Sequence, residues 1–233
     1  ISGSEDVIIM RMLDILFSSL AIAVLSPLFI LVILILRFTG EGEVFFVQNR
    51  IGIDGNIFGL LKFVTMLKDS PNMGTGTVTV KGDPRILPVG SLLRKTKINE
   101  LPQLLNILKA DMSVIGPRPL THDSFSAYPK ETQDIIKKVR PGLSGIGSII
   151  FRQEEEILSG EKRGIDFYKN TLAPYKGKLE EWFVEHKSIK VYLSAILVTI
   201  WVVISPQSNI PWSIFKDLPE PPDQLKNLLN YPN

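Results

Sequence analysis

The sequence predicts an α/β fold that is mostly α-helical and associated with a membrane. A stretch of 22 residues without a charge lies near the N-terminus, a second apolar stretch of 15 residues lies near the C-terminus, and two short strand-like runs lie between them. With 233 residues, 45% of them hydrophobic, the chain is long enough for one sizeable domain plus a membrane element. We expect an N-terminal segment with a membrane helix over residues 1–40, a small globular core over 41–152, and partly interfacial helices over 153–233.

The first apolar stretch runs from Ile15 to Leu36 and matches the roughly 20 residues that a helix needs to cross a bilayer. Pro27 lacks an N–H and clashes with the preceding turn, so the helix should kink or break there. The hydroxyl of Ser26 can then satisfy a backbone group that the break exposes. Because Arg11 and Arg37 place a cation at each end, the positive-inside rule does not distinguish the ends. Two topologies stay open: a re-entrant hairpin on the cytoplasmic side, and a Pro-kinked spanning helix.

The second apolar stretch, Val191–Ser205, is short for a spanning helix and suits an interfacial amphipathic helix. Trp182 and Trp201, with Lys187 and Lys190 just before the stretch, are residue types that favour the lipid headgroup region. The alternative is an ordinary helix of a protein core.

Between the two apolar stretches, Glu43–Gln48 has the composition of a strand, and Ile57–Met66 that of a second strand or of a strand-to-helix unit. Gly52, Asp54 and Gly55 lie between them and are typical of a turn. Further along, Leu92–Leu108 carries leucines at helical spacing. The other expected elements are a loop over 70–81, a polar helix over 121–138, a turn over 141–147, and amphipathic helices without a catalytic pattern over 154–190.

Composition excludes several classes of function. The chain has no Cys, which excludes disulfides, thiolate metal sites and a Cys nucleophile, and is consistent with a reducing compartment. A net charge of +2 is too small to indicate nucleic-acid binding. His122 and His186 are the only histidines, which leaves little room for a His-based triad or a zinc site.

Polar residues gather between Asp83 and Arg118, and no acid occurs between Ile86 and Lys97. Such a cationic surface suits a diphosphate, because guanidinium and ammonium groups offset oxyanion charge. The alternative is a solvated or lipid-facing helix surface, which we favour for Lys95 and Lys97. Arg118 stands in a Pro-Arg-Pro turn that restricts its backbone, which suits either a phosphate contact or a structural role.

Glu100 is expected at the start of a helix, because Pro102 implies that a helix begins near Asn99. An acid there either interacts favourably with the helix dipole or serves as a nucleophile, base or metal ligand beside a phosphoryl group. Mg²⁺ is the ion expected at such a site, since it keeps few protein ligands and bridges phosphate oxygens.

Six stretches of the chain together form a recognisable ordered pattern: Gln48–Gly52, Leu61–Met66, Asp83–Ile86, Asn99–Leu104, Asp111–Pro119 and Arg140–Gly145. They occur in the same order as in the bacterial sugar transferases, and from Met10 to Ile200 the chain resembles this family of monotopic phosphoglycosyl transferases.

The resemblance implies a re-entrant membrane helix broken at a Ser-Pro pair, here Ser26-Pro27, and a catalytic core at the cytoplasmic face of a bacterial inner membrane. It implies transfer of a C1-phosphosugar from a UDP-sugar to polyprenyl phosphate, usually undecaprenyl phosphate, with release of UMP and with Mg²⁺. This reaction is the first membrane step in making a glycoconjugate such as exopolysaccharide or lipopolysaccharide. The implied route is ping-pong, through a covalent phosphosugar on the Asp of an Asp-Glu pair. Membrane lipids are implied as partners, nucleic acid is not, and a homodimer stays open.

The resemblance assigns a role to each matching residue. Asn99 holds the nucleophile position and Glu100 is its partner, and these two are also the expected Mg²⁺ ligands. The expected phosphate contacts are Lys62, Arg85 and Arg118, and the expected supporting residues are Arg50, Asp83 and Arg140.

Two positions depart from the family pattern. Val64 stands where the family often has Arg, and Asn99 stands where it has Asp, although a neutral amide is a poor nucleophile. Three explanations stay open for Asn99: an engineered substitution, a natural subclass that uses Glu100, and a catalytically silent membrane scaffold or regulator. A glycosyltransferase that moves only the sugar is a further alternative, and nothing in the sequence names the sugar.

Overall fold

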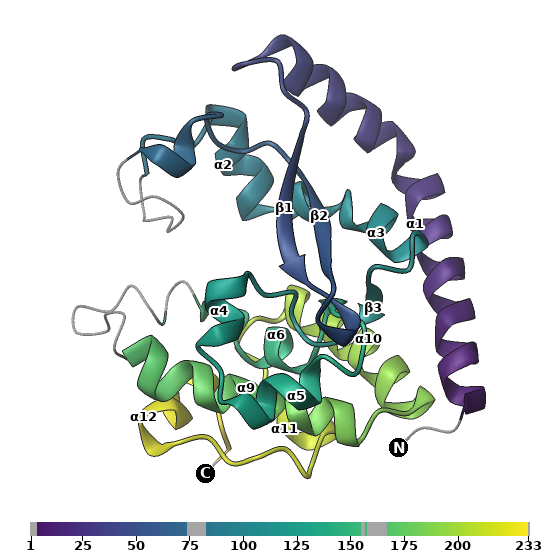
Figure 1. The fold of residues 1–233 in the computed structure, drawn as a ribbon, viewed down its shortest axis with the longest axis vertical. Helices are drawn as coiled ribbons and strands as arrows, with labels where there is room; N and C mark the ends of the chain where they lie inside the picture. The colour runs from purple at the N-terminus through teal and green to yellow at the C-terminus, as the bar shows by residue number, and fades with distance from the viewer. Residues whose placement is uncertain (1–3, 74–82, 155–156, 158–166, 233) are drawn as a thin grey trace.

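The computed structural model describes residues 4–73, 83–154, 157 and 167–232. Helix α1 (Ser4–Phe38) runs along one whole side of the molecule, and all other elements lie to one side of it (Figure 1). Most of the loop expected over 70–81, and part of the helical region expected over 154–190, lie outside the described residues.

Helix α1 is 35 residues long and curves along its length without interruption (Figure 1). The prediction that the helix is broken at the Ser-Pro pair is therefore wrong, because the helix continues through Pro27. Because Pro27 has no N–H, the carbonyl of Ala23 loses its usual partner in the next turn. The hydroxyl of Ser26 donates to this carbonyl at 2.8 Å, which confirms its predicted role and lets the helix continue.

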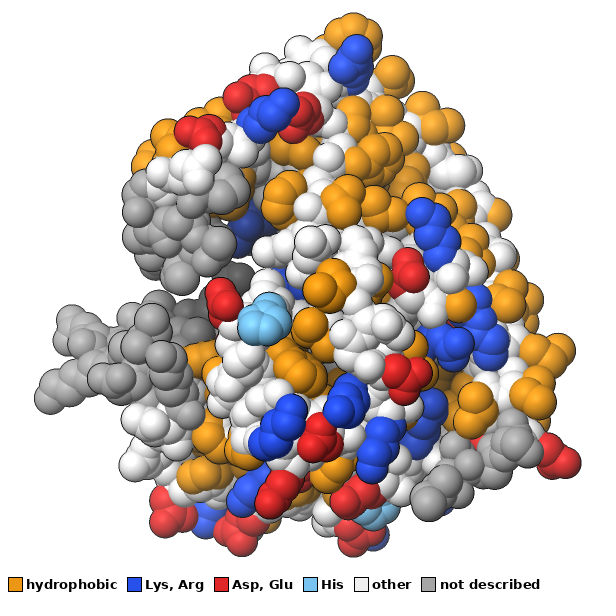
Figure 2. Space-filling model, in the orientation of Figure 1, with side chains coloured by type: hydrophobic (Ala, Val, Ile, Leu, Met, Phe, Trp, Pro, Cys, Tyr) orange, Lys and Arg blue, Asp and Glu red, His pale blue; other side chains and the backbone are white. Residues whose placement is uncertain are grey.

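The segment Glu5–Phe38 of α1 is long and apolar enough to cross a membrane. Of the most apolar stretch of 18 residues within it, only 11% is buried. Hydrophobic side chains cover the edge of the molecule that α1 forms (Figure 2). The inner face of the helix instead packs on the core through residues such as Met10, Val32 and Leu36.

Both predicted strands are found, as β1 (Phe45–Ile51) and β2 (Ile57–Phe63), and they pair antiparallel as a hairpin. Its turn contains Asp54 and Gly55, both with positive φ, as the turn composition predicts. Phe63 is buried against α1, so the hairpin lies over the C-terminal half of that helix.

The helical character predicted over 92–108 is found, but not as one helix, and no α-helix begins near Asn99. The chain instead forms α2 (Pro88–Lys95), a 3₁₀ turn (Ile98–Glu100) and α3 (Gln103–Leu108). Lys97 adopts a left-handed conformation with φ 60°, which ends α2, and Pro102 then precedes the first residue of α3. The two residues at the predicted helix start therefore lie in the 3₁₀ turn.

The polar helix predicted over 121–138 is divided into α4 (His122–Ser126) and α5 (Lys130–Ile136), with Pro129 between them. The turn predicted over 141–147 is wrong, because Gly142–Ser144 is strand β4, parallel to β3 (Ser113–Ile115), and leads into α6 (Ile146–Ile150). A Cβ on Gly142 would lie 2.0 Å from the backbone nitrogen of Gly116, so only glycine permits this approach.

The C-terminal part is helical. Its main elements are a π-helical turn (Tyr168–Leu172), α9 (Ala173–Glu185), α10 (Ile189–Ile204), α11 (Ile210–Ile214) and α12 (Asp223–Lys226). The largest hydrophobic cluster takes residues from all three expected segments, for example Met10, Ile146 and Leu179.

Helix α10 is found where the second apolar stretch predicts a helix, and it has two different faces. Tyr192 and Ala195 are buried in the largest cluster, whereas Trp201 is half-exposed. Trp182 was expected in the lipid headgroup region, but it is 7% exposed, stacks on His186 and is part of the core.

Candidate functional site

The site is built where β2, the 3₁₀ turn and the Pro-Arg-Pro turn approach one another. The Nζ atom of Lys62, on β2, lies 3.9 Å from Oε1 of Glu100 in the 3₁₀ turn. The turn is held near β2 by α3, because Asn106 accepts from the N–H of Leu61 and donates to the carbonyl of Gly59. A side chain in α3 thus fixes the position of the acidic turn that precedes it.

The backbone of Arg118 is anchored on two sides. The N–H of Gly142 donates to the carbonyl of Pro117, and the N–H of Arg118 donates to Oε1 of Glu180 at 3.3 Å. The side chain of Arg118 is exposed and lines a large cavity. The turn therefore presents its guanidinium from a fixed backbone.

Cations outnumber acids at this site. Burial lowers the pKa of Lys62 to about 8; Glu100 opposes this shift, while Arg118, Arg50 and Arg94 add to it. Burial, together with Arg118, lowers the pKa of Arg50 to about 10. One carboxylate does not offset so many cations, and a bound anion would.

Two cavities border the acidic turn. The larger, about 670 Å³, is bordered by Glu100 and Arg118, and the smaller, about 380 Å³, by Asn99 and Lys62. Arg94 lines both and so lies at the boundary between them. The solvated surface expected for Lys95 and Lys97 is only part of their setting, because both are exposed and both also line the larger cavity together with Arg94.

Asn99 is 7% exposed, and its Oδ1 atom is buried without a hydrogen-bond partner among the described residues. Such an oxygen is available to a ligand. Within the described part of the chain there is no group of three or more His, Cys, Asp or Glu that could hold a metal. An ion that keeps most of its waters, as Mg²⁺ does, needs few protein ligands, so the single unpartnered oxygen of Asn99 suits such an ion better than one that needs a full protein shell.

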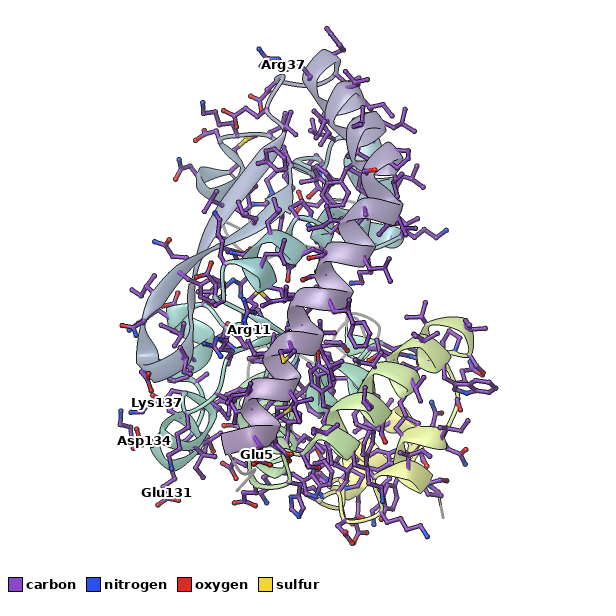
Figure 3. All side chains as sticks on the ribbon, turned by 90° about the vertical axis from the view of Figure 1, so that its right-hand side faces the viewer. Glu5, Arg11, Arg37, Glu131, Asp134 and Lys137 are labelled. Atoms are coloured by element: carbon purple, nitrogen blue, oxygen red, sulfur yellow. The ribbon has the colours of Figure 1, made fainter. Side chains whose placement is uncertain are left out.

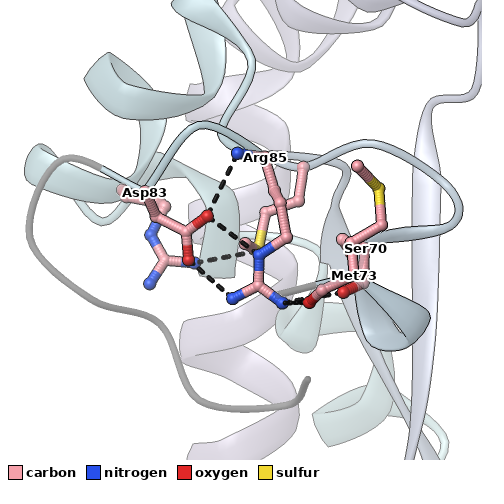
Figure 4. A network of polar contacts seen from close by, with 6 residues as sticks. Ser70, Met73, Asp83 and Arg85 are labelled. Atoms are coloured by element: carbon pink, nitrogen blue, oxygen red, sulfur yellow. Dashed lines mark hydrogen bonds and ion pairs between the residues drawn. The ribbon is translucent and has the colours of Figure 1, made fainter. Parts of the chain in front are cut away.

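Two of the expected residues are placed away from the cavities. Arg85 and Asp83 form a buried ion pair at 2.6 Å, and Arg85 also donates to the carbonyls of Ser70 and Met73 (Figure 4). Neither residue lines either cavity. In this geometry the pair ties two chain segments together, which matches the structural role considered for Asp83 and leaves the expected phosphate contact of Arg85 without support.

Arg140 and Arg50 differ in their positions. Arg50 lines the smaller cavity and donates to the carbonyl of Pro119 and to Gln48. Arg140 donates to the carbonyl of Ala110 and borders a separate cavity near the N-terminal half of α1. The structure thus places Arg50, but not Arg140, beside the acidic turn.

Sequence analysis missed the charged residues of α9 at and near the larger cavity. Lys176, on α9, pairs with Glu154 at 2.6 Å, and Lys176 lines the cavity. Glu180, one turn further along α9, is 1% exposed, and burial raises its pKa to about 7. The sequence did contain a signal: Lys176 and Glu180 are four residues apart and so lie on the helix face that also carries Ala173 and Leu179. The other polar residues nearby obscured this pattern.

Arg11 ties the N-terminal half of α1 to α3. Figure 3 places Arg11 and Arg37 far apart along the helix, with apolar side chains projecting between them. The guanidinium of Arg11 donates to the carbonyls of Ile107 and Leu108 at 2.6 and 3.0 Å, at the C-terminal end of α3. This cation therefore has a protein partner that the sequence did not reveal.

The chain is similar to known bacterial sugar transferases over most of its length. The family model described as bacterial sugar transferase matches residues 5–206. The chain is 37% identical over 158 residues to the exopolysaccharide production protein ExoY of Rhizobium meliloti, a match that covers 62% of this chain and 70% of that protein. It is 36% identical over 190 residues to the UDP-glucose:undecaprenyl-phosphate glucose-1-phosphate transferase of Caulobacter vibrioides, covering 80% of this chain and 67% of that protein.

A third relative carries a different sugar in its name. It is the UDP-N-acetylgalactosamine-undecaprenyl-phosphate N-acetylgalactosaminephosphotransferase of Aeromonas hydrophila, 37% identical over 144 residues, which cover 61% of this chain and 34% of that protein. Together with the long apolar helix α1, these matches indicate a membrane-associated transferase. With the family match extending over most of its length, the chain belongs to the bacterial sugar transferase family.

Proposed function

We propose that this chain transfers a C1-phosphosugar from a UDP-sugar to polyprenyl phosphate, in the cell undecaprenyl phosphate, and releases UMP. The proposed place is the cytoplasmic face of a bacterial inner membrane, at the first membrane step of glycoconjugate assembly. The observation that carries the proposal is the cluster of Lys62, Arg50 and Arg118 around Glu100, at the junction of two cavities. The names of the relatives supply the reaction class.

The cluster suits phosphoryl transfer because the transition state concentrates negative charge on phosphate oxygens. In the first step a carboxylate oxygen of the enzyme attacks the phosphorus bound to the sugar. The bond from that phosphorus to the UMP oxygen breaks, and UMP leaves with its electron pair. In the second step a phosphate oxygen of the polyprenyl phosphate attacks the same phosphorus and releases the carboxylate. Glu100 is the carboxylate of this turn, and we assign it the nucleophilic role that the amide of Asn99 performs poorly.

Mg²⁺ is proposed as the cofactor, held by Glu100 and by the unpartnered Oδ1 of Asn99. When bound, it would offset charge on the phosphate oxygens. Lys62 and Arg118 would orient the diphosphate from two sides of the turn, which limits how much the residues must reorganise during transfer.

The product nucleotide tests the proposal. Purified chain in nanodiscs with undecaprenyl phosphate, Mg²⁺ and a panel of UDP-sugars should release UMP with at least one sugar. Release of UDP would instead identify a transferase of the sugar alone. If neither this chain nor Asn99→Asp releases a nucleotide with any donor, the remaining interpretation is a catalytically silent scaffold or regulator. The amide at position 99 favours that interpretation.

A further inference from the structure

A third cavity, of about 530 Å³, lies beside the N-terminal half of α1. Its walls come mainly from α1, from the segment that follows α5, and from the junction of α9 and α10. It shares no lining residue with the two cavities at the acidic turn. The proposed transfer therefore assigns no task to this third cavity.

More cations than acids line the third cavity. The cations are Arg11, Lys138, Arg140 and Lys187, and the acids are Asp14 and Glu185. Glu185 is exposed to solvent. Oδ1 of Asp14 is 2.7–2.9 Å from three donors, which belong to Ser113, Val114 and Tyr192. The acids are thus engaged elsewhere or solvated, and the cavity has an excess of positive charge that suits an anion.

Lys187 and Arg140 carry donors that the described part of the chain leaves unused. Lys187 is half-buried and forms no hydrogen bond or ion pair with a described residue. Burial lowers the pKa of Lys187, Arg140 lowers it further, and Asp14 opposes the shift. Arg140 donates from Nε to the carbonyl of Ala110 at 2.8 Å, and among the described residues its two terminal nitrogens have no acceptor. A phosphate oxygen would supply the acceptor that both side chains lack.

The wall that α1 contributes is apolar and continues onto an exposed surface. Val7 and Met10 line the cavity. On the adjacent face of the helix, Ile8, Met12 and Ile15 are 60%, 65% and 44% exposed. Lys and Arg side chains lie next to the hydrophobic edge that α1 forms (Figure 2). The cationic cavity therefore opens beside a surface suited to face lipid.

We propose that the third cavity binds the headgroup of an anionic phospholipid, with its phosphate at Lys187, Arg140 and Lys138 and its acyl chains along the exposed apolar face of α1. Cations beside a membrane element attract anionic lipids in this way. A soluble phosphate would leave the apolar wall unused. About 530 Å³ is a usual size for a ligand pocket, so the cavity holds a headgroup while the chains stay in the bilayer.

Such a lipid would anchor the N-terminal half of α1 at the level of the headgroups. Arg11 projects from α1 on the side where the end of α5 lies, marked by Lys137 (Figure 3). Its guanidinium holds the helix to the C-terminal end of α3, and Asp14 holds it to β3 and α10. A lipid bound between these contacts is therefore held by a fixed wall, and its binding does not require turnover.

Photoaffinity labelling tests the lipid site. A phosphatidylglycerol with a diazirine near the ester end of one acyl chain is irradiated with the full chain in phosphatidylcholine nanodiscs, and labelled peptides are mapped by mass spectrometry. We expect the label on residues 7–15. Excess phosphatidylglycerol should reduce it at least tenfold, whereas added phosphatidylcholine, undecaprenyl phosphate or inorganic phosphate should change it less than twofold.

Each other outcome of the competition overturns the proposal in a different way. Competition by inorganic phosphate would assign the cavity to a soluble anion, and competition by undecaprenyl phosphate would assign it to the acceptor of the proposed transfer. Equal competition by phosphatidylcholine, or label outside residues 7–15, would show that no headgroup site exists here.

Two double variants with the same change in net charge locate the site. Lys138→Gln with Lys187→Gln removes two cations that line the third cavity, whereas Lys137→Gln with Lys190→Gln removes two that do not line it. The first should reduce the competed label at least tenfold and the second less than twofold, so a general attraction of the chain to anionic lipid is controlled. Equal labelling of the two double variants would overturn the site.

An unchanged thermal unfolding midpoint establishes that each double variant is folded, and the competition decides the proposal on the unmodified chain in any case. Labelling and nucleotide release also separate this inference from the proposed function. UMP release without a competed label would refute the lipid site alone. A competed label without UMP release, in this chain and in Asn99→Asp, would refute transfer and retain the lipid site.

Discussion

The ammonium nitrogen of Lys62 lies 3.9 Å from a carboxylate oxygen of Glu100, across the junction between β2 and the 3₁₀ turn. Both side chains are about one-fifth exposed, at 19% and 21%. The pKa of Lys62 is nevertheless lowered to about 8, first by burial and then by three neighbouring guanidinium groups, which Glu100 only partly offsets. The pair is therefore a charged contact in a site that still has excess positive charge, and it leads to a test of donor binding.

Donor binding should weaken as pH rises through about 8, because Lys62 loses its proton there while the diphosphate ester of the donor keeps its charge. A bound diphosphate favours the charged lysine, so the complex should lose the proton at a higher pH than the free protein. Isothermal titration calorimetry with UDP-sugar between pH 7 and 9 measures the effect without turnover. Lys62→Arg should bind with little pH dependence, since a guanidinium stays charged. A flat profile for the unmodified chain would remove Lys62 from the phosphate contacts.

Arg118→Ala should lower the rate of UMP release at least tenfold, which corresponds to about 1.4 kcal/mol of transition-state stabilisation. Its backbone is already anchored by Glu180 and by the Gly142–Pro117 hydrogen bond, so the fold should be retained. Arg118→Lys should restore only part of the rate, because an ammonium cannot form a bidentate contact. Lys130→Ala, which changes an exposed cation on α5, is the control. An unchanged rate in Arg118→Ala would make the residue structural.

The parts of the fold that sequence predicts are those set by local pattern. Strands β1 and β2 follow from two strand-like runs on either side of Asp54 and Gly55, and the helices α1 and α10 follow from their apolar length. Strand β4 is missed because it has three residues and exists only through pairing with β3, which is distant in the sequence.

The candidate site is predictable to a similar extent. The resemblance selects Lys62, Glu100 and Arg118, and the structure brings these three together. Arg85 matches a motif equally well, yet its guanidinium is directed at Asp83, an ion pair that depends on how the chain folds around it. Glu180 is missed for the converse reason: its burial arises from the packing of α9, not from any motif.

Glu180 gives a prediction about stability and pH. Burial raises the pKa of its carboxyl from 4.5 to about 7, so between these values the folded state binds this proton more tightly than the unfolded state. The contribution to stability is therefore full below pH 4.5 and is lost as pH rises to about 7, in total about 3 kcal/mol. Thermal unfolding from pH 4.5 to 7.5 should show this slope in the unmodified chain and in Glu181→Gln. Glu180→Gln should lack it, and an identical slope in that variant would assign the effect to another group.

Both ends of α1 should lie on the same side of the membrane. Near the N-terminal end of α1, Oδ1 of Asp14 accepts from the hydroxyl of Tyr192 at 2.7 Å. Near the C-terminal end of α1, Leu36 packs with Phe63. A helix with one end across the bilayer would lose one set of these contacts. Reporters fused at Glu5 and Asn233 should therefore both give cytoplasmic signals, as the re-entrant topology requires, and a periplasmic signal at Glu5 would contradict it. Pro27→Ala should straighten the helix and shift part of the population to a spanning form.

The role of the Asn99-Glu100 pair is decided by intact-protein mass spectrometry with donor alone, because without acceptor the covalent intermediate accumulates. We expect the unmodified chain to gain the mass of one sugar phosphate and to release UMP, and Glu100→Gln to do neither. The physical reason is that Glu100 supplies a carboxylate next to Lys62, whereas the amide of Asn99 cannot attack phosphorus effectively. Glu154→Gln is the matched control, since this other acid on the larger cavity is paired with Lys176 and should still allow the adduct. An adduct that appears in Asn99→Asp but not in the unmodified chain would show that the nucleophile belongs at position 99 and that its amide silences the enzyme. Retained UDP-sugar binding in each variant separates loss of the nucleophile from loss of the site.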